Sequence, residues 1–512
     1  MTLLEPANVA LAGIPAPAIA FVILVSAVGF FFYVMYRRID LLRKTLPDSR
    51  LEDIPQRIKL MLLYGFGQAR QPRYPLAGIL HILLFAGFMI LSLRSLTLIG
   101  RGFFAGFHLP LLTGSVGLAY EVLKDYTVLI VLAVCIVAII RRAVFKPARY
   151  QHPEGPGHGA EAYVILGLVA GLMITDMIFD GSALLGQAAH HSVAAFPAAN
   201  LSAVFMSGAG ASTLNVLHVG GYWAHILIFF GLLNYLPISK HFHVITAIPN
   251  VFLANLNKGA IKPVQCGVSD WMELPECGLS RFERFTWKHV LDFYSCADCG
   301  RCSDNCPATT VGRSLSPRMI SVKSRDYAYE HYPVFGAPPN PGEEEFTGGV
   351  IKEEEIWACT TCGACEQECP IFIEYIDKIV DMRRYLVEQG RMPSSLQKPM
   401  QQIKKKGNAY AGAKNKRADW TKELQDCEVR ILGPGESADL LFFVDSCGSF
   451  DPRIQEISRS FARILNRAGA DFGILGPDET DSGNEIRRLG EEGLFEQIAQ
   501  KNIEALQARQ YK

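Results

Sequence analysis

The chain has 512 residues with 50 basic and 50 acidic side chains, a zero net charge that excludes a chain-wide basic surface for nucleic acid. Its length is enough for two or three domains. Hydrophobic residues make up 49% of it and charged residues 20%, which excludes a disordered or collagen-like chain and fits an ordinary soluble enzyme poorly.

The first half of the chain predicts an all-α bundle of five transmembrane helices. Apolar stretches without charged residues cover 6–36, 76–93, 126–140, 162–175 and 214–237. Residues 126–140 make about 22 Å of helix, so we expect Glu121, Lys124 and Asp125 at an interface, where they help to cross roughly 30 Å of hydrocarbon. Asp176 and Asp180 are expected as interface-exposed carboxylates, with a proton relay to a quinone as the alternative.

Loop charges predict the orientation of this bundle. Segments 37–75 and 141–161 contain nine and four Lys or Arg residues, whereas 100–120 and 181–212 contain one and none. The positive-inside rule then places the N-terminus outside, and both basic loops and everything after Lys240 in the cytoplasm. The opening MTLLEPANVA lacks the basic region of a cleaved signal peptide. We therefore expect a retained first helix in the inner membrane of a prokaryotic cell.

Four histidines fall on the predicted membrane helices or their cytoplasmic extension. His81 lies a few residues inside the second helix, and His218, His225 and His243 lie on the fifth helix or just beyond it. Imidazoles on facing helices can bind haem iron from both sides. A histidine that caps a helix end or hydrogen-bonds to a carbonyl is the plainer alternative for each of them.

The run WAHILIFFGLLNYLPISKHFHVITAIP resembles the fifth helix of the γ subunit of respiratory nitrate reductase, a dihaem cytochrome b. The five-helix plan with an outside N-terminus is similar as well. Two haem-ligating histidines of that family match His225 and His243, and the cytoplasmic-side ligand of its second helix matches His81. The resemblance implies one haem b between His81 and His243.

The resemblance does not by itself supply a partner ligand for a second haem at His225. The remaining ligand position of the family's second helix is occupied by Leu91 in this chain. A second haem therefore needs another partner from the outer segments, such as His108, His190 or His191.

Eight of the thirteen cysteines form two runs of identical spacing, CADCGRCSDNCP and CTTCGACEQECP. Both match C-x2-C-x2-C-x3-C-P, which holds 4Fe–4S clusters in bacterial ferredoxins. In this pattern three close thiolates hold one cluster, and the fourth, before the proline, reaches the other. Zinc would favour paired C-x2-C knuckles, and a reducing cytoplasm disfavours disulfides. We predict two 4Fe–4S clusters, one held by Cys296, Cys299, Cys302 and Cys369 and the other by Cys359, Cys362, Cys365 and Cys306.

The last part of the chain predicts a partial α/β module. LLFFVDSCGSF and FGILG predict strands that are each followed by a helix, and no G-x-G-x-x-G supports a dinucleotide site. VDSCGSFDPR and GNEIRRLGEEGLF resemble the opening of the cysteine-rich module of heterodisulfide reductases. Relatives of that catalytic subunit occur in membrane-bound electron-transfer-flavoprotein:menaquinone oxidoreductases.

This module departs from its family in two ways. Asp481 stands where the family often has a cysteine, and no Cys-Cys-Gly run occurs. Cys447 and Cys427 alone therefore cannot complete the family's cluster, so we expect either a second polypeptide that completes the module or an incomplete product. Cys447 is interpreted as a cluster ligand or, equally, as a buried thiol.

The order of these parts predicts a multi-domain chain. We expect a transmembrane haem b domain over 1–250, an α-helical di-cluster ferredoxin domain over 251–400 and an incomplete cysteine-rich α/β module over 401–512. The predicted function is a respiratory membrane oxidoreductase that passes electrons between a quinone, by resemblance menaquinone, and a cytoplasmic partner such as an electron transfer flavoprotein. The alternatives are a heterodisulfide- or thiol-linked reductase subunit, and an electron-relay subunit without its own active site.

Overall fold

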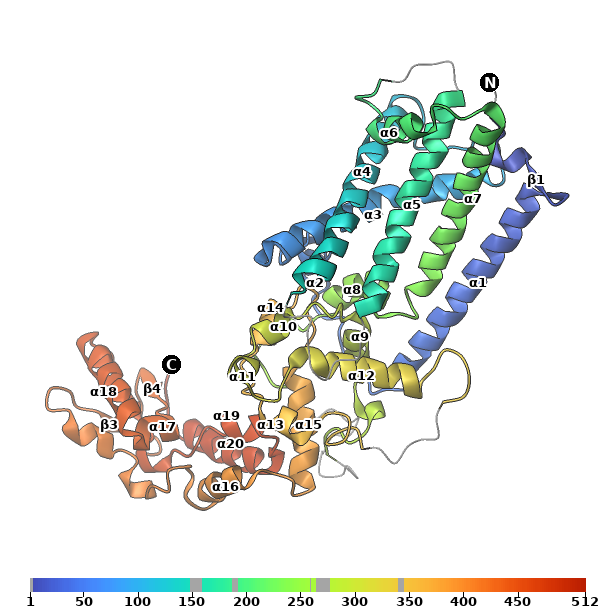
Figure 1. The fold of residues 1–512 in the computed structure, drawn as a ribbon. Coiled ribbons are helices and arrows are strands. Elements are labelled where there is room, and N and C mark those ends of the chain that lie inside the picture. Colours follow the sequence, from blue (N-terminus) through green and yellow to red (C-terminus); the bar gives the residue numbers. More distant parts are fainter. Residues whose placement is uncertain (1–2, 148–158, 187–191, 258, 264–276, 339–344) are drawn as a thin grey trace.

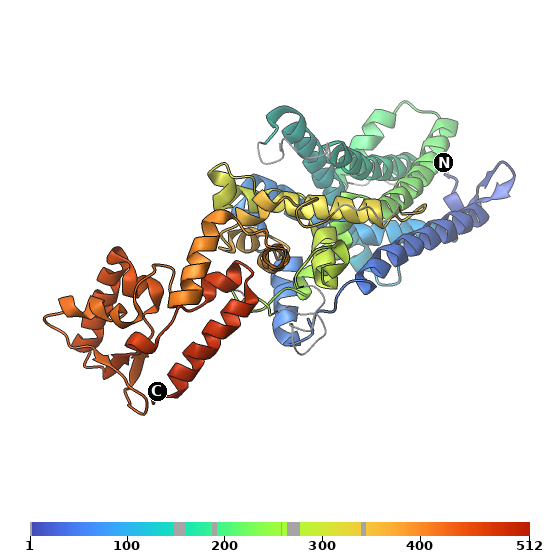
Figure 2. The same cartoon turned by 90° about the horizontal axis from the view of Figure 1, so that it is seen from below.

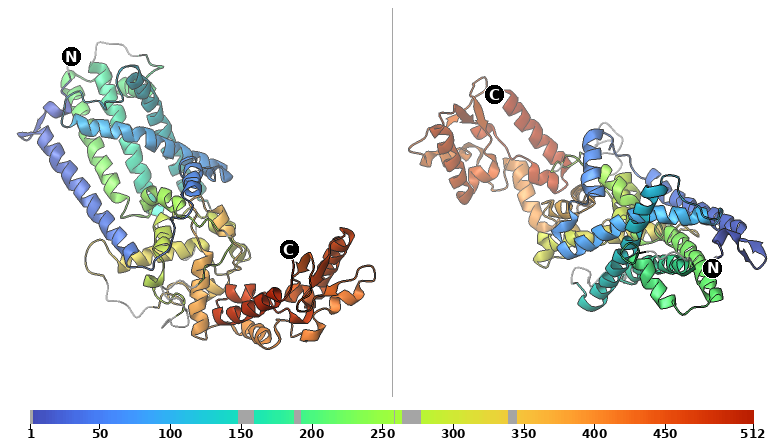
Figure 3. Two further views of the ribbon diagram at one scale, coloured as in Figure 1. Left: turned by 180° about the vertical axis from the view of Figure 1, so that it is seen from behind. Right: turned by 90° about the horizontal axis from the view of Figure 1, so that it is seen from above.

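The structure is a computed structural model that describes residues 3–147, 159–186, 192–257, 259–263, 277–338 and 345–512. Among these residues, five helices are long and apolar enough to cross a membrane. They are α1 (Ala16–Arg43), α3 (Pro75–Arg101), α4 (Gly114–Ile140), α5 (Gly159–Gly186) and α7 (Ala211–Tyr235). Helix α3 crosses the others obliquely (Figures 1 and 3). The predicted five-helix membrane bundle is confirmed.

The two ends of the bundle differ in what they carry. One end holds the N-terminus, a small hairpin of β1 (Ala10–Leu11) and β2 (Ile14–Pro15), and α6 (Pro197–Met206) (Figure 1). The other end holds α2 (Ile54–Leu60) and α8 (His243–Phe252) and faces the cysteine-containing domain. The basic segment 37–75 lies at this second end, so we call it the inner end and the first one the outer end.

Helix α4 corrects the expected position of Lys124 and Asp125. The helix has 27 residues, about 40 Å at 1.5 Å per residue, and therefore needs no interface residues to reach across a bilayer. Lys124 is 2% and Asp125 1% exposed, and Glu121 lies on the same helix within salt-bridge distance of Lys124. Lys124 and Asp125 face protein, because α5 and α6 supply their partners. Glu121 is partly exposed and pairs with Arg94 of α3 and with Lys124.

The ferredoxin domain is built from short helices around one core. They are α9 (Trp287–Ser295), α10 (Arg301–Asp304), α11 (Pro307–Thr310), α12 (Pro317–His331), α13 (Glu353–Trp357), α14 (Ala364–Glu368) and α15 (Ile376–Glu388). Phe282, Phe285, Phe293 and Phe346 are buried in this core together with Leu41 of α1. Burial of each such side chain contributes roughly 1.5–3 kcal/mol, so the core holds the domain and the end of α1 together.

Polar contacts also fix the ferredoxin domain to the loop between α1 and α3. Leu46 forms a β-bridge with Thr286, and the Arg50 guanidinium makes an ion pair of 2.8 Å with the Glu374 carboxylate. Both side chains of that pair are buried. Because a broken buried pair leaves an uncompensated charge, this contact holds the membrane loop and the ferredoxin domain in one arrangement.

The C-terminal module contains a three-stranded parallel sheet in the order β3 (Arg430–Ile431), β5 (Phe472–Ile474), β4 (Leu440–Phe442). Helices α16 (Ser394–Lys406), α17 (Asp445–Phe450), α18 (Pro452–Arg467), α19 (Asn484–Arg488) and α20 (Glu492–Gln507) surround it. The predicted α/β unit is confirmed. Met400 and Ile403 of α16 pack on α19 and α20, so we propose a module boundary before α16 rather than at residue 400. The module lies beyond α15, away from the bundle (Figures 1 and 2).

Candidate functional site

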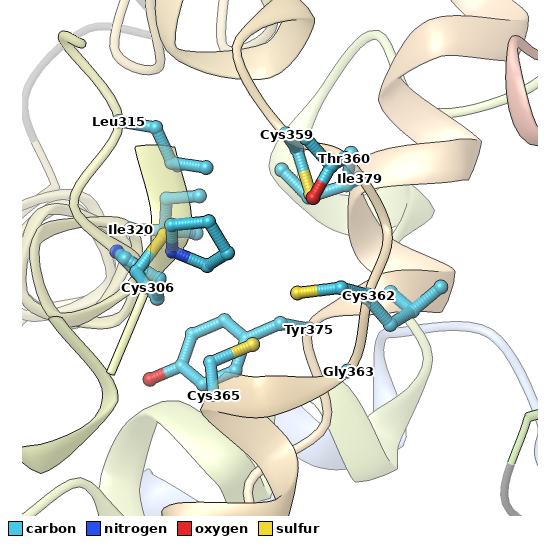
Figure 4. Close-up of a pocket in the computed structure, with 13 residues that line it drawn as sticks. Cys306, Leu315, Ile320, Cys359, Thr360, Cys362, Gly363, Cys365, Tyr375 and Ile379 are labelled. Atoms are coloured by element: carbon cyan, nitrogen blue, oxygen red, sulfur yellow. The ribbon is translucent and has the colours of Figure 1, made fainter. Parts of the chain in front are cut away.

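Two cavities in the ferredoxin domain are each lined by four cysteines. Cys296, Cys299, Cys302 and Cys369 line one of them, which we call the Cys302 site. Cys306, Cys359, Cys362 and Cys365 line the other, which we call the Cys362 site. In Figure 4 the sulfurs of the Cys362 site point into one common space. The structure thus brings the thiols together in the two groups that the sequence predicts, each with one thiol from the opposite run.

Left-handed backbone turns create this arrangement in both runs. Asp298 has φ +53° and Gly300 φ +80° in the first run, and Thr361 has φ +53° and Gly363 φ +75° in the second. Such residues reverse the direction of the chain within a few positions. Each loop therefore wraps around its cavity before α10 or α14 begins.

The donor set fits an iron–sulfur cluster better than a single metal ion. No three His, Cys, Asp or Glu side chains among the described residues converge closely enough to hold one ion, whereas four thiols ring each cavity. The twelve cysteines within the described segments are all free thiols. Burial raises the pKa of Cys296 to about 11 and that of Cys369 to about 12, so each needs a bound cation to become a thiolate at neutral pH.

Tyr375 lies between the two cavities and lines both of them. Its hydroxyl is 3.7 Å from the Cys302 sulfur and accepts a hydrogen bond from the Ser321 hydroxyl at 3.0 Å. Backbone amides of Thr361 and Ile373 lie 3.3 Å from the sulfurs of Cys359 and Cys369. Hydrogen bonds to cluster sulfurs are one of the factors that set a cluster's potential.

Three arginines that sequence reasoning missed contact the backbone of the cysteines. Arg70, in the loop before α3, donates to the Cys369 carbonyl at 2.6 Å. Arg325 of α12 donates to the Cys296 carbonyl at 3.2 Å, and Arg383 of α15 donates to the Ile356 and Cys359 carbonyls. No spacing rule links these arginines to the cysteine runs, since each contact depends on the tertiary fold.

His81 and His243 lie at the inner end of the bundle. His81 donates from Nδ1 to the Gln68 side-chain oxygen at 2.9 Å, and His243 donates from Nδ1 to the Lys240 carbonyl at 3.3 Å. Burial lowers the pKa of His243 to about 4, with a further contribution from the neighbouring His81. Neither Nε2 has a hydrogen-bond partner among the described residues. This tautomer is the one in which imidazole binds a metal through Nε2.

His225 and His218 have a different environment. His225 lies 3.4 Å from the Thr175 hydroxyl through Nδ1 and 3.5 Å from the Ser95 hydroxyl through Nε2. His218 stacks on Phe179 with ring centroids 4.1 Å apart. Of the partners considered for a second haem, His108 lies 3.4 Å from an Arg101 nitrogen, and His190 and His191 lie outside the described residues.

The outer half of the bundle contains a buried cluster of charges. Arg94 pairs with Asp176 at 2.8 Å and with Asp180 at 2.5 Å, and Lys124 pairs with Asp180 and Glu121. Asp176 is 2% exposed. The expectation of interface-exposed carboxylates is therefore wrong for Asp176, because a cation from a neighbouring helix compensates it inside the protein.

Cys447 lies at the start of α17 in the C-terminal module and is exposed. Its sulfur is 3.5 Å from the Tyr410 hydroxyl. The interpretation of Cys447 as a buried thiol is therefore wrong. Asp481 accepts a hydrogen bond of 2.7 Å from the hydroxyl of Ser446, the residue before Cys447.

Comparisons with known proteins agree with this site. A model of the 4Fe-4S dicluster domain matches residues 295–372, which include all eight cysteines of the two runs. The chain is 33% identical to a probable iron-sulfur-binding oxidoreductase, FadF, of Bacillus subtilis, over 95% of this chain and 73% of that protein. It is 29% identical to the EtfAB:quinone oxidoreductase of Syntrophomonas wolfei, over 98% of this chain and 73% of that protein.

A third relative matches only part of the chain. It is a polypeptide of the dihydromethanophenazine:CoB–CoM heterodisulfide reductase of Methanosarcina barkeri, 26% identical over 44% of this chain and 55% of its own length. No solved structure matches the chain. With a polytopic helical bundle, a dicluster domain and this degree of identity to FadF over 95% of its residues, the chain belongs to the FadF-like family of iron–sulfur oxidoreductases.

Proposed function

We propose that this protein is a membrane quinone oxidoreductase that exchanges electrons with a soluble electron transfer flavoprotein. A flavin hydroquinone gives up two electrons and two protons as it becomes the oxidised flavin. A quinone takes up two electrons and two protons as it becomes the quinol. The relative from Syntrophomonas wolfei, an EtfAB:quinone oxidoreductase by name, supports these two partners.

The observation that carries the proposal is the direct contact between a thiol site and the membrane loops. The Arg70 guanidinium donates to the Cys369 carbonyl, and Arg301, next to Cys302, donates to the Arg70 carbonyl at 3.0 Å. Gln68, two residues before Arg70, accepts the hydrogen bond from His81 Nδ1. A redox site and a lipid-facing bundle are therefore joined within one polypeptide, as a quinone-linked electron carrier requires.

The eight thiols fit two 4Fe–4S clusters, which supply one-electron redox chemistry when they are bound. In this proposal the Cys302 site holds one cluster and the Cys362 site the other. The residues of the chain position the thiols through the left-handed turns, bury five of the eight and place backbone N–H groups on the sulfurs of Cys359 and Cys369.

We also assign a haem b to His81 and His243. The fixed Nδ1 hydrogen bond of each imidazole leaves Nε2 available as an axial ligand. His81 lies on α3 and His243 begins α8, and His81 is near enough to contribute to the lowered pKa of His243. Imidazoles from different helices of a bundle can hold a haem between them. Loop charges support placing this end, with the ferredoxin domain, in the cytoplasm of a prokaryotic cell.

The direct test is reduction of the anaerobically purified full chain by a menaquinol analogue without any partner protein. We expect the 4Fe–4S signals in electron paramagnetic resonance and a haem b absorption band to report reduction. The reverse test adds electron transfer flavoprotein reduced by its own dehydrogenase. If quinol fails to reduce the protein until another polypeptide is added, the chain is a relay subunit and the quinone-oxidoreductase proposal is wrong.

A further inference from the structure

We propose that the two thiol sites have different roles: the Cys302 site exchanges electrons with the membrane domain, and the Cys362 site with the soluble partner. This inference rests on the proposed function, because it assumes that both sites hold a cluster. It goes further by assigning an order to the sites and a tuning residue to each.

Solvent exposure distinguishes the two sites. In the Cys302 site, Cys296, Cys302 and Cys369 are buried and Cys299 is partly buried. In the Cys362 site, Cys362 is exposed, and Thr360, which follows Cys359 and lines the same cavity, is exposed as well. Electron transfer falls steeply with distance, so a soluble partner approaches the Cys362 site more closely than the Cys302 site.

The membrane loops contact the Cys302 site. Besides Arg70, which donates to the Cys369 carbonyl, Lys240 lies 3.7 Å from the carboxylate of Asp298, the residue before Cys299. The Lys240 carbonyl also accepts the hydrogen bond from His243 Nδ1. One short segment thus connects the imidazole at the inner end of the bundle with the loop that surrounds the Cys302 site.

Arg325 of α12 lies beside the Cys302 site. Its side chain is 1% exposed, its NH1 donates to the Cys296 carbonyl, and its Nε is 3.6 Å from the Asp326 carboxylate. Its NH2 has no hydrogen-bond partner among the described residues. A positive charge in this position stabilises the reduced, more negative form of a cluster at the Cys302 site.

The C-terminal module contacts the Cys362 site at the turn between Cys359 and Cys362. Arg488 of α19 donates to the Thr360 carbonyl and to the Thr361 hydroxyl, within the turn between Cys359 and Cys362. Arg383 donates to the Cys359 carbonyl and to the Arg488 carbonyl. Arg383 and Arg325 therefore have equivalent positions. Each donates to the carbonyl of the first cysteine of a run, Arg383 at the Cys362 site and Arg325 at the Cys302 site.

The experiment uses the full cluster-loaded chain in detergent and two readouts that need neither quinone nor partner. A soluble dysprosium chelate relaxes exposed paramagnets, so in the unmodified protein we expect it to alter the microwave saturation of one 4Fe–4S signal and not the other. Redox titration of Arg325→Gln and Arg383→Gln then identifies the signals. Each substitution removes one positive charge, so each lowers the midpoint potential of its own cluster.

The expected result is that the dysprosium-sensitive signal is the one shifted by Arg383→Gln and the protected signal is the one shifted by Arg325→Gln. The opposite assignment, or equal dysprosium effects on both signals, would overturn the proposal. If a glutamine variant does not assemble, Arg325→Lys and Arg383→Lys keep the charge but move it by shortening the side chain, and the same assignment is required. A failure of quinol to reduce the protein leaves both readouts unchanged, so it bears on the proposed function alone.

Discussion

In the ferredoxin domain eight thiols surround two cavities, whereas in the outer half of the membrane bundle Arg94 and Lys124 are surrounded by carboxylates. Both regions bury polar groups, but the groups that offset the cost of this burial differ between them. The charges of the bundle neutralise one another across α3, α4 and α5. The thiols lie next to one another, and the sulfurs of Cys359 and Cys369 accept hydrogen bonds from uncharged backbone amides. Burial raises the pKa of Cys369 to about 12. A ligand is needed in the ferredoxin domain and not in the outer half of the bundle.

The inner end of the bundle resembles the ferredoxin domain in this respect. His81 and His243 each use Nδ1 for a fixed hydrogen bond and keep Nε2 free of partners among the described residues. His225, in contrast, has a hydroxyl near each ring nitrogen. The comparison favours a haem at the inner end and a structural role for His225.

The largest expected effect is the loss of a whole cluster in Cys302→Ala. The cavity keeps only three thiols, so we expect one of the two 4Fe–4S signals and roughly half of the iron to disappear. Electron paramagnetic resonance and iron analysis measure both. Cys447→Ala is the control, because Cys447 lies in the C-terminal module away from both cavities, and it should keep both signals. Two intact signals in Cys302→Ala would contradict the assigned ligands.

The membrane histidines allow the same kind of test. His243→Ala removes one axial ligand, so we expect the haem b absorption band of the isolated membranes to disappear. His225→Gln keeps hydrogen-bonding capacity toward Ser95 and Thr175 and should leave that band unchanged. If His225→Gln removes half of the haem, the bundle holds two haems and the contrast between its two ends is wrong.

The cysteine runs show what local sequence can predict. A fixed spacing together with Gly300 and Gly363 already determines the turns, so the two four-thiol groups follow from the motif alone. The five membrane helices follow from apolar length for the same reason. The burial of Asp176 does not, because Arg94 is 82 residues away and only the packing of α3 on α5 brings the two together.

The contacts of Arg325 and Arg383 also depend on tertiary packing and not on local sequence. Both arginines lie on helices with many charged neighbours, and a solvated position is the ordinary interpretation of such residues. Only the docking of α12 and α15 on the cysteine loops gives them a role. A single sequence carries no signal for such long-range contacts.

Arg94→Leu tests the buried cluster of ion pairs in the outer half of the bundle. Removing the guanidinium leaves Asp176 and Asp180 with Lys124 as their remaining cation, and breaking a buried ion pair costs about 3–5 kcal/mol. We expect a clearly lower thermal midpoint in detergent, with the 4Fe–4S signals retained in the folded fraction. Arg430→Ala, which breaks an exposed pair with Asp471, should cost less than about 1 kcal/mol. Equal effects of the two substitutions would show that the bundle does not depend on its charges.

We expect the smallest effect on stability from Asp377 in the ferredoxin domain. Its buried carboxylate is only partly offset by neighbouring positive charge. Its carboxylate accepts a hydrogen bond from the Lys262 backbone at 3.2 Å, but the Lys262 ammonium is 4.0 Å away. Burial raises the pKa of Asp377 to about 6. The folded state therefore binds a proton more tightly than the unfolded state, and this group makes the protein less stable as pH rises from about 4 to about 6.

Asp377→Asn removes that charge and keeps a side-chain oxygen for the Lys262 amide. We expect the variant to match the unmodified protein near pH 3, below the unfolded pKa, and to be more stable at pH 7, by at most about 3 kcal/mol, since one pK unit corresponds to about 1.4 kcal/mol. Thermal unfolding at several pH values, taken as the difference between variant and unmodified protein, isolates this group from other carboxylates. A difference that stays constant with pH would mean that folding does not raise the pKa of Asp377, and that its hydrogen bond and the Lys262 charge offset its burial.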